Sequence, residues 1–489
     1  MTHFKTTFRK ALKATAGACL ITALCAVQAS AQSLLRDTEI EETLQDFTTP
    51  ILHAAELNPK SVDLFLVNDP SLNAFVTRGQ NIFLHSGLII EADNPNQLKG
   101  VIAHEAGHIV GAHIVRSDEG NKSATGAILI AAAVGLAAIL AGEGEAGALV
   151  LGGSQQFGQV EALAYSRTNE SAADQYAAQF LEKTNQSGRG LIAFFEKFRA
   201  QELLSNARRF PYFRGHPLSA RRIDALRERV AESDYADLKD SDADQHRHEM
   251  MQAKLRGFLD APQVVYALYP ETNQSKPARY ARSVANFKAA DLKNAVREVD
   301  SLIEDEPDNP YFHELKAQIL YESGKGIESI APGRRALELK PDAPLLKTAL
   351  ARSLMHTEDT ADTKAAIELI KSALLDEESY SYGWFLLAQA YGDIGQTALA
   401  KYATAERFYA VGNYTSARSF AQRAQKELVR SDPQYRRASD IIVISNANLS
   451  KKRSRRRGPK PFNFEVTSSG SDNFSDSNNR ARNRFSTGR

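Results

Sequence analysis

The stretch NPNQLKGVIAHEAGH, residues 94–108, decides the fold of the first half of the chain. Asn94 and Pro95 are residue types preferred as the N-cap and the first residue of a helix. Apolar residues then recur at helical spacing, at Leu98, Val101, Ile102, Ala106 and Ile109. The stretch therefore predicts one helix with an apolar face, and it places His104 and His108 four residues apart on one side of that helix.

The motif HEAGH at 104–108 has the spacing of a helical zinc site. Two histidines four residues apart can present their imidazoles to one Zn²⁺, and Glu105 can reach a water on that ion. The pattern His-Glu-x-x-His arises by chance in roughly a few per cent of chains of this length, so alone it leaves open two histidines that face solvent or each other. Its place on a predicted helix, directly after predicted strands, favours the metal.

A catalytic zinc needs a third protein ligand and an open fourth position. Gly111 fits the longer form His-Glu-x-x-His-x-x-Gly-x-x-His, but that form requires a histidine where the chain has Ile114. His113 is one residue early and is interpreted as structural. The other option is a carboxylate on a later helix, where Glu170 and Asp174 lie four residues apart. Glu170 could ligate the metal, and Asp174 could accept a hydrogen bond from the other N–H of a ligand histidine.

Further patterns place the motif helix in a small unit of helices and strands. An opening helix is predicted from the apolar spacing of Ile40, Leu44, Phe47 and Ile51. Short strands are predicted over 62–67, around Phe75-Val76 and around Ile82-Phe83-Leu84. The last of these is expected to be an edge strand that pairs with an extended substrate, because main-chain pairing reads sequence only weakly. Helical patterning then dominates to about residue 235.

A repeat occupies the second half of the chain. Pro307 and Pro341 each precede an aspartate and lie 341 − 307 = 34 residues apart, which is the tetratricopeptide period. Another unit begins at Trp384 and includes Gly395, and a last helical pair turns at Gly412-Asn413. Stacked helix pairs of this kind build a concave surface for an extended segment or a partner. The alternative is an ordinary helical domain.

The N-terminus has the pattern of a secretory signal. Four basic residues up to Lys13 precede an apolar stretch from Ala14 to Val27, and Ala29-Ser30-Ala31 is a small-x-small cleavage site. The alternative is an N-terminal membrane anchor. Both cysteines of the chain, Cys19 and Cys25, fall within this segment. Disulfides and cysteine-ligated metals are therefore not expected in the mature chain, which fits an exported periplasmic protein.

Charge is segregated along the 489 residues. The net charge is +1, of which residues 1–31 contribute +4 and residues 451–489 contribute +8, so residues 32–450 carry 1 − 4 − 8 = −11. A body this acidic is a poor nucleic-acid binder, because phosphate binding needs a positive surface. The basic tail is predicted to be disordered, and it could be attracted to an anionic membrane surface or remain solvated.

Residues 124–142, ATGAILIAAAVGLAAILAG, are long and apolar enough to be a membrane-span candidate. A single span here would separate HEAGH from Glu170 across the bilayer, and the following apolar stretch is too short to return the chain. We therefore expect residues 124–153 to form a helical hairpin or lid near the active-site cleft, or one that dips into a membrane surface.

Three ordered motifs resemble the HtpX/Ste-type zinc endopeptidases. They are HEAGH at 104–108, YSRTNESAAD at 165–174, and RGHP at 214–217 followed by Arg222. The resemblance covers residues 40–235. With a signal peptide and C-terminal repeats, the chain is most similar to the BepA-like branch of this family, which are periplasmic proteases of outer-membrane protein quality control. The long basic tail departs from that pattern.

The resemblance implies one zinc ion per chain, held by His104, His108 and Glu170. Glu105 corresponds to the catalytic glutamate of the family, and Asp174 to the acid that supports a ligand histidine.

The resemblance also implies that His216 lies beside the metal and that His216 and Arg222 belong to the catalytic set. Two roles for His216 are open. Its N–H could stabilise the oxyanion of the reaction. Alternatively, its neutral imidazole could occupy the fourth position on zinc and hold the protease off until a partner or substrate moves the loop.

The sequence thus predicts a mainly α-helical protein with a zincin-type protease domain and a tetratricopeptide-repeat α-solenoid. The expected function is a periplasmic zinc endopeptidase that degrades misfolded or stalled outer-membrane proteins and assists their assembly. Its repeats would recruit substrates or the outer-membrane assembly machinery. The alternative is a chaperone or scaffold whose protease site is mostly closed. The predicted parts are a signal peptide at 1–31, the protease domain at 32–235, a connector at 236–276, the repeats at 277–450 and the basic tail at 451–489.

Overall fold

The computed structural model describes residues 34–77, 80–113, 167–204, 216 and 218–456. The predicted signal peptide, the apolar stretch 124–153 and the part of the tail after residue 456 lie outside these residues. The described chain is mainly helical with one small sheet, which confirms the predicted fold class. It divides into two compact units, residues 1–378 and 379–489, which are described separately below.

The protease part of the first unit combines a four-stranded sheet with helices. One of its helices covers residues 167–183. The other elements are β1 (Leu34–Leu35), α2 (Thr38–Ala54), the 3₁₀ turn η1 (Pro59–Ser61), β2 (Leu64–Val67), β3 (Ala74–Thr77), β4 (Asn81–His85), α3 (Ser86–Glu91), α4 (Pro95–Val110), α7 (Arg189–Leu204) and α9 (Ala220–Ala231). The predicted opening helix and the three predicted strands are all present, whereas β1 and α3 were not predicted.

The sheet has the strand order β1-β2-β4-β3. β4 pairs in parallel with β2, with Phe65 opposite Phe83, and antiparallel with β3, with Phe75 opposite Phe83. The prediction that the strand around Phe83 is an edge strand is therefore wrong. β4 lies between β2 and β3, so β3 is the terminal strand of the described sheet.

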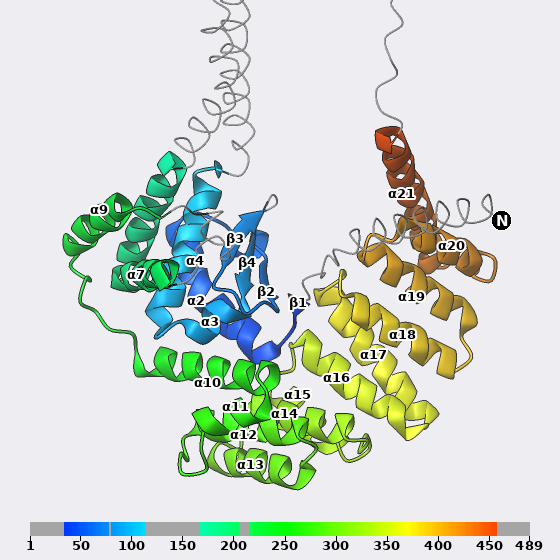
Figure 1. The fold of residues 1–489 in the computed structure, drawn as a ribbon. Coiled ribbons are helices and arrows are strands. Elements are labelled where there is room, and N and C mark those ends of the chain that lie inside the picture. Colours follow the sequence, from blue (N-terminus) through cyan, green and yellow to red (C-terminus); the bar gives the residue numbers. More distant parts are fainter. Residues whose placement is uncertain (1–33, 78–79, 114–166, 205–215, 217, 457–489) are drawn as a thin grey trace, which may run out of the picture. The chain divides into compact units, whose positions relative to one another are not determined.

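The core of this part lies between the sheet and α4. Side chains of alternating strand residues, including Ile82 and Leu84, pack with Leu98, Val101 and Ile102 of α4, and all five are fully buried. Figure 1 shows α4 beside the sheet, with α7 on its other flank and α9 beyond α7. The helix that carries HEAGH is thus enclosed by the sheet on one side and by other helices on the other.

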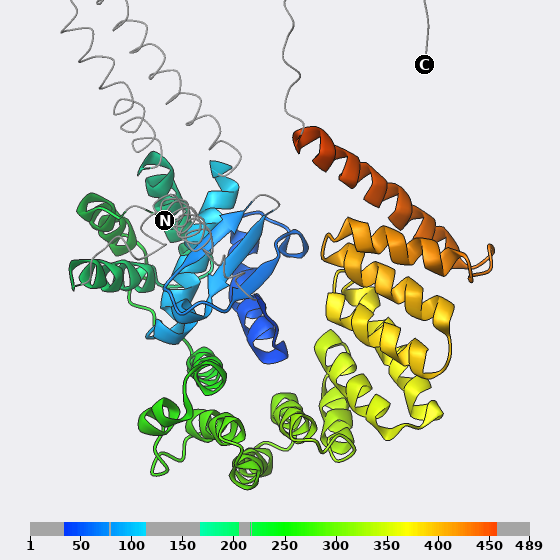
Figure 2. The same cartoon turned by 45° about the vertical axis from the view of Figure 1, so that its right-hand side comes forward.

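The repeats continue the first unit as antiparallel helix pairs. Figure 2 shows these pairs following one another along the chain. Two helices of the predicted connector precede them, α10 (Asp242–Leu259) and α11 (Pro262–Leu268). The helices that follow are α12 (Lys276–Lys288), α13 (Leu292–Asp305), α14 (Pro310–Glu322), α15 (Ile330–Leu339), α16 (Pro344–Leu354), the 3₁₀ turn η3 (Met355–Thr357) and α17 (Thr360–Asp376). The two prolines of the predicted period each lie in the turn before a helix, at Pro307 before α14 and at Pro341 before α16.

The described part of the second unit, residues 379–456, contains four helices. They are α18 (Ser381–Asp393), α19 (Thr397–Ala410), α20 (Tyr414–Gln425) and α21 (Pro433–Arg456). Gly395 and Gly412 have positive φ, at 74° and 69°, and end α18 and α19 at the predicted turns. α21 continues six residues past the predicted boundary at 450 (456 − 450). No helix of the described residues combines the length and apolar character needed to cross a membrane.

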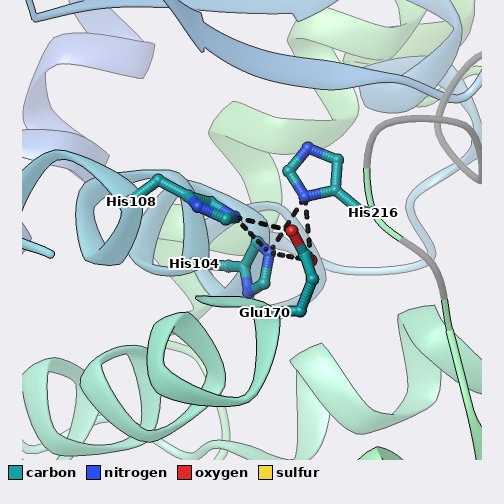
Figure 3. Close-up of side chains that lie close together, drawn as sticks. All are labelled: His104, His108, Glu170 and His216. Carbon is teal, nitrogen blue, oxygen red and sulfur yellow. Dashed lines mark hydrogen bonds and ion pairs between the residues drawn. The ribbon is translucent and has the colours of Figure 1, made fainter. Parts of the chain in front are cut away.

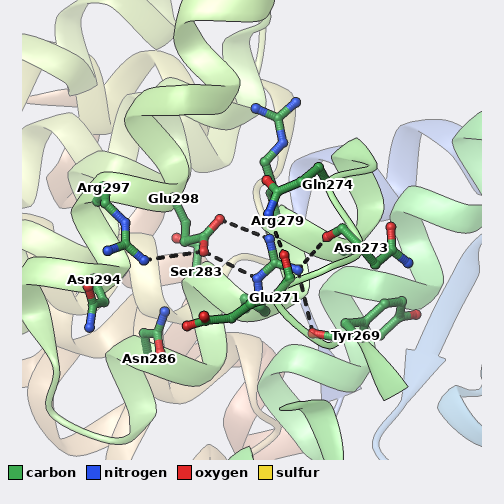
Figure 4. A network of polar contacts seen from close by, with 12 residues as sticks. Tyr269, Glu271, Asn273, Gln274, Arg279, Ser283, Asn286, Asn294, Arg297 and Glu298 are labelled. Atoms are coloured by element: carbon green, nitrogen blue, oxygen red, sulfur yellow. Dashed lines mark hydrogen bonds and ion pairs between the residues drawn. The ribbon is translucent and has the colours of Figure 1, made fainter. Parts of the chain in front are cut away.

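The segment predicted as a connector, 236–276, is tied to the first repeat by a buried arginine. Arg282 of α12 is 2% exposed, and its Nε and Nη2 each lie 3.2 Å from Glu298 of α13. Its Nη1 donates to the carbonyl oxygens of Pro270 at 3.0 Å and Asn273 at 2.6 Å. Figure 4 shows this polar network around the loop after α11. The end of the connector is therefore fixed to the repeats rather than free to move.

A second buried cation joins the protease part to the repeats within the first unit. Lys254 of α10 is 2% exposed. Its Nζ lies 2.7 Å from Asp37 and 3.3 Å from Glu39 of the α2 N-terminus, and 3.8 Å from Glu314 of α14. Tyr280 of α12 donates its hydroxyl to Glu39 at 2.7 Å. One cation thus faces three carboxylates from two helices, and Lys254 must stay charged to offset them.

This charge imbalance predicts a pH-dependent stability. Burial is the largest influence on Glu314 and raises its pKa to about 7, against the opposing charge of Lys254. This pKa is higher than that of a glutamate in the unfolded chain. The contribution of protonated Glu314 to the free energy of unfolding is therefore fully present below pH about 4 and is lost as the pH rises through about 7. Glu314→Gln should therefore gain stability relative to the natural protein between pH 5 and pH 8, by at most about 3 kcal/mol.

Thermal unfolding of both proteins at pH 5 and pH 8 measures this effect. Glu304→Gln is the matched control, because Glu304 is an exposed glutamate of α13. A stability difference between Glu314→Gln and the natural protein that is the same at both pH values would contradict the expectation.

Candidate active site

The site is built on the C-terminal half of α4. Asn94 caps the helix by accepting a hydrogen bond from the Gln97 backbone N–H at 3.0 Å, and Pro95 is the first helical residue, as predicted. The next turns are buried without interruption through His108. His104 and His108 therefore enter the interior from one face of a helix that cannot rotate without exposing its apolar side.

Four side chains from three segments converge beside α4, as Figure 3 shows. His104, His108, Glu170 and His216 each place one ligand-type atom within 4.8 Å of the others. Nε2 of His104 lies 3.1 Å from Nε2 of His108 and 3.4 Å from Oε2 of Glu170. Nδ1 of His216 lies 3.1 Å from the same Glu170 oxygen and 3.3 Å from Nε2 of His104. All four residues are buried.

Glu170 reaches this cluster because two helices approach each other closely. Gly107 is the second variable residue of HEAGH, and a Cβ added there would lie 2.8 Å from the carbonyl oxygen of Ala173 and 3.1 Å from Cβ of Tyr176. Any larger residue at position 107 would force the helix 167–183 away from α4. The glycine in the motif thus sets the distance between the histidines and the carboxylate.

Asp174 and Arg222 contact the residues of the cluster and fix their orientation. Oδ1 of Asp174 lies 3.0 Å from Nδ1 of His104. Arg222 donates to both Asp174 oxygens, through Nε at 2.7 Å and Nη2 at 2.8 Å, and its Nη1 lies 3.2 Å from Glu170. Arg222 contacts the carboxylates of the cluster and lies over the ring of Phe195 at 5.4 Å. A bidentate pair of this kind fixes the orientation of both carboxylates and, through Asp174, of the His104 ring.

His113 supports the other histidine. Its Nδ1 lies 2.9 Å from Nδ1 of His108. A Cβ at Gly111 would lie 2.2 Å from Nε2 of His113, so the glycine leaves room for this ring. A structural role for His113 was predicted from the sequence, but its partner His108 was not. The sequence signal for this contact is the pair Gly111 and His113 directly after the motif, where a glycine leaves room for an imidazole.

Glu105 lies next to the cluster without a hydrogen bond of its own. It is fully buried, and neither carboxylate oxygen has a hydrogen-bond partner. The Nε2 of His216 lies 3.6 Å from its Oε1. Burial raises the pKa of Glu105 above its usual range. A buried carboxylate with unused acceptors is costly unless it serves a ligand or a reaction.

The three imidazoles of the cluster cannot all be charged. Burial tends to lower the pKa of His104, but hydrogen bonds to Asp174 and Glu170 raise it to about 9. Burial, together with the nearby His104 and His216, lowers the pKa of His108 well below its usual range. Burial works against ionisation of Glu170, but the hydrogen bonds from His104 and His216 outweigh it and lower that pKa. The site therefore favours neutral His108 and an ionised Glu170.

The residues fit a divalent metal ion. When the three imidazoles are neutral, as metal ligation requires, and Glu105, Glu170 and Asp174 are ionised, the buried carboxylates and the Arg222 guanidinium sum to −3 + 1 = −2. A dication would neutralise this charge in a place where an uncompensated charge is expensive. Imidazole nitrogens and a carboxylate oxygen are donors suited to such an ion, and the convergence of four of them gives the coordination number of a tetrahedral site.

Comparisons with known proteins agree with this geometry. Residues 35–230 match the sequence profile of peptidase family M48. These residues form an M48 metalloprotease domain. The chain is also 24% identical over 371 residues to the beta-barrel assembly-enhancing protease of Escherichia coli, covering 74% of each chain. Metalloprotease YcaL of the same organism is 30% identical over 178 residues, which are 35% of this chain and 63% of that protein. The predicted enzyme class, a metalloprotease, is confirmed.

Every residue that the sequence predicted for the site lies in or beside this cluster of the M48 domain. His104, His108, Glu170 and His216 form the cluster itself, and Glu105 is adjacent. Arg222 was predicted as part of the catalytic set together with His216. In the structure it contacts Asp174 and Glu170, so it lies behind the ligand-type atoms rather than among them.

The contacts of Arg222 predict that its substitution weakens metal binding. Arg222→Lys keeps the charge but cannot form the planar bidentate pair with Asp174. We expect this substitution to weaken metal binding about 10- to 100-fold, because partners of ligand residues contribute that much. Competition between the protein and a chelator for added zinc measures the change. The matched control is Arg221→Lys, since Arg221 is the exposed neighbour on α9, and equal losses in the two variants would contradict the assigned role.

Proposed function

We propose that this protein is a zinc-dependent endopeptidase that acts on unfolded or misassembled outer-membrane proteins in the periplasm. One observation carries the proposal. A buried cluster of His104, His108, Glu170 and His216 lies beside Glu105, whose two carboxylate oxygens are buried and without a hydrogen-bond partner.

The ligand chemistry supports zinc. His104, His108 and Glu170 would hold the ion through two imidazoles and a carboxylate, a donor set found in catalytic zinc sites. Both cysteines of the chain lie before residue 32, so thiolate ligands from the protease domain are excluded. One ion per chain is expected, because this is the single such cluster found among the described residues. Bound zinc supplies Lewis acidity toward the scissile carbonyl and lowers the pKa of a coordinated water to about 7.

Glu105 acts as the general base. Its carboxylate accepts a proton from the attacking water and delivers it to the leaving amine. Burial raises its pKa, which suits a group that must accept a proton and then release it. Asp174 holds the Nδ1 proton of His104 and so presents Nε2 of that ring to the metal. Arg222 is a positioning residue that acts through Asp174 and Glu170.

The substrate binds as an extended strand along β3. β3 is the terminal strand of the described sheet and pairs only with β4 there, so its outer edge offers main-chain donors and acceptors. The sheet packs against α4, the helix of the zinc ligands. Main-chain pairing selects for an extended conformation more than for sequence, which suits an enzyme that cuts unfolded chains.

The outer-membrane role and the location rest on the relative. The E. coli protein that aligns over 74% of this chain is named for enhancing β-barrel assembly. The signal-like N-terminus of this chain and its lack of cysteines after residue 31 agree with export to the periplasm. We propose that the repeats bind substrates or the outer-membrane assembly machinery. The basic residues after 450 contact anionic membrane surfaces or remain solvated.

His216 favours a second candidate activity, a chaperone or scaffold whose protease site is closed at rest. Its imidazole nitrogen lies within 3.3 Å of both His104 and Glu170, where it can take the fourth position on the metal. The residue is 7% exposed, so the cluster is shielded from solvent in this state. We propose that displacement of the His216 imidazole from the cluster opens the site, and that the protein binds clients in the closed state and cuts them in the open state.

Substitution of the two glutamates separates metal binding from catalysis. Glu105→Gln should retain stoichiometric zinc and lose at least about a hundredfold in the rate of digestion of an unfolded outer-membrane barrel protein, because it cannot accept the proton. Glu170→Ala should lose zinc as well as activity. Zinc content by mass spectrometry and digestion by gel electrophoresis measure the two effects. Stoichiometric zinc in Glu170→Ala would remove Glu170 from the ligand set, and an active Glu105→Gln would overturn the mechanism.

Substitution of His216 separates its two possible roles. If the imidazole closes the site for 90% of the time, His216→Ala should raise the basal rate of peptide cleavage roughly tenfold. If its N–H only stabilises the oxyanion, the same variant should be about a hundredfold to a thousandfold slower under all conditions. The control is His53→Ala, since His53 is an exposed histidine of α2. An unchanged rate for His216→Ala would rule out both roles.

A further inference from the structure

A buried histidine outside the metal cluster lies at the end of the strand next to β3. His85 is the last residue of β4 and is 1% exposed. Ile82 and Leu84 of the same strand enter the core beside α4, and neighbouring residues of a strand point to opposite faces of the sheet. His85 therefore lies on the face that is turned away from α4 and from the metal cluster. Its burial there is not explained by the chemistry of the active site.

The His85 ring contacts every second residue of the segment 69–75, which leads into β3. Its Nδ1 lies 2.9 Å from Oγ of Ser71 and 3.5 Å from Oδ1 of Asp69. Its Nε2 lies 3.4 Å from Nδ2 of Asn73. The ring is edge-on to that of Phe75, with 5.9 Å between the ring centroids. One buried imidazole thus holds three polar side chains and an aromatic ring of a single segment.

Backbone hydrogen bonds fix the same segment at two further points. The carbonyl oxygen of Asp69 accepts a hydrogen bond from the backbone N–H of Gly87 at 3.0 Å. The carbonyl oxygen of Asn73 accepts one from the backbone N–H of His85, also at 3.0 Å. Between these two points the chain is held through its side chains, and the His85 ring is their common partner. The ring therefore controls how the chain enters β3.

The environment of His85 favours a neutral ring with both nitrogens in use. Burial lowers the pKa of His85 below its usual range, against the opposing charge of Asp69. A neutral imidazole has one donor nitrogen and one acceptor nitrogen. The contacts fit donation by the Asn73 amide to Nε2 and donation by Nδ1 to the Ser71 hydroxyl. An apolar side chain of similar size would fill the space and make neither hydrogen bond.

β3 needs such support because it is short and lies at the end of the sheet. It has four residues, and in the described sheet it pairs with β4 alone. An isolated pair of short strands is only marginally stable in water. β3 also contacts α4, the helix of the metal-ligand histidines. The alignment of β3 therefore decides where its outer edge lies relative to the cluster.

We propose that His85 is a positioning residue, which holds β3 in the alignment that lets an extended substrate pair with its outer edge. This role rests on the proposed pairing of the substrate with β3. His85 contacts neither substrate nor metal, and it acts through Ser71, Asn73 and Phe75. Main-chain hydrogen bonds span about 2.7–3.2 Å between donor and acceptor, so a shift of the strand by about 1 Å breaks them.

Two dye-labelled peptides of equal length test the proposal by fluorescence anisotropy. Both are octapeptides of Thr, Val and Ala, and the second carries methyl groups on three consecutive central main-chain nitrogens. Methylation removes the donors that strand pairing requires, whichever alternate set of residues faces β3. The full chain is used with bound zinc and with Glu105→Gln, so that neither peptide is cut. The unmodified peptide should bind about tenfold more tightly, and this affinity ratio measures main-chain pairing.

Substitutions at His85 and Ser71 are added to the Glu105→Gln chain. His85→Leu should lower the affinity ratio from about tenfold to below about threefold, while the zinc content stays the same. His85→Gln retains a donor and an acceptor and should restore most of the ratio. Ser71→Ala removes one hydrogen bond at a half-buried position, so it keeps the test valid if His85→Leu fails to fold, and it should lower the ratio at least about twofold.

Ser61→Ala is the matched control, because Ser61 is an exposed serine of η1. It should leave the affinity ratio unchanged. An unaltered ratio in both His85→Leu and Ser71→Ala would refute the positioning role. Loss of zinc in parallel with the ratio would also refute it, since His85 would then support the whole domain rather than β3.

The same peptides separate this role from the proposed function. Equal affinity for the two peptides in the Glu105→Gln chain would refute pairing at β3 and the role of His85 with it. Failure of the natural protein to digest an unfolded outer-membrane barrel protein would count against the proposed protease activity alone, because the affinity ratio is measured without cleavage.

Discussion

The close approach of α4 to the helix 167–183 is the constraint on which the site depends. It brings the carboxylates of Glu170 and Asp174 into a buried space already occupied by imidazoles. Glu105 adds a third buried carboxylate. Buried carboxylates are stable only when their charge is offset, and the single positive charge of Arg222 offsets one of these three. The remaining negative charge must be neutralised by a bound cation or by protons. The packing of the two helices therefore also favours binding of a metal ion.

A related logic connects the protease part to the repeats within the first unit. Asp37 and Glu39 lie at the N-terminus of α2, and the buried Lys254 of α10 forms ion pairs with both. Because Glu314 of α14 faces the same lysine, the first helix of the protease domain and the repeats share one buried charge cluster. This shared contact is one of the interactions that hold the protease part and the repeats together within the first unit.

Local patterns predicted much of the fold because each reports a local interaction. Asn94 and Pro95 fix the start of α4 through a cap and a preset φ, and the apolar spacing fixes its buried face. The 34-residue period predicted the helix pairs because the turns before α14 and α16 carry equivalent prolines, Pro307 and Pro341. β1 and α3 were not predicted because they are too short to show a period. The edge strand was assigned wrongly because strand order depends on how the chain returns to the sheet, not on the composition of β4.

The sequence by itself determined which residue types were available for chemistry and which of them share a helix face. It placed His104, Glu105 and His108 on one turn, Glu170 above Asp174, and His216 in a separate segment. The tertiary structure alone decided that these three segments meet, that Arg222 pairs with Asp174, and that His113 supports His108. The physical reason is that helix periodicity is a property of neighbouring residues, whereas distances across more than forty residues depend on packing, here on the missing side chain of Gly107.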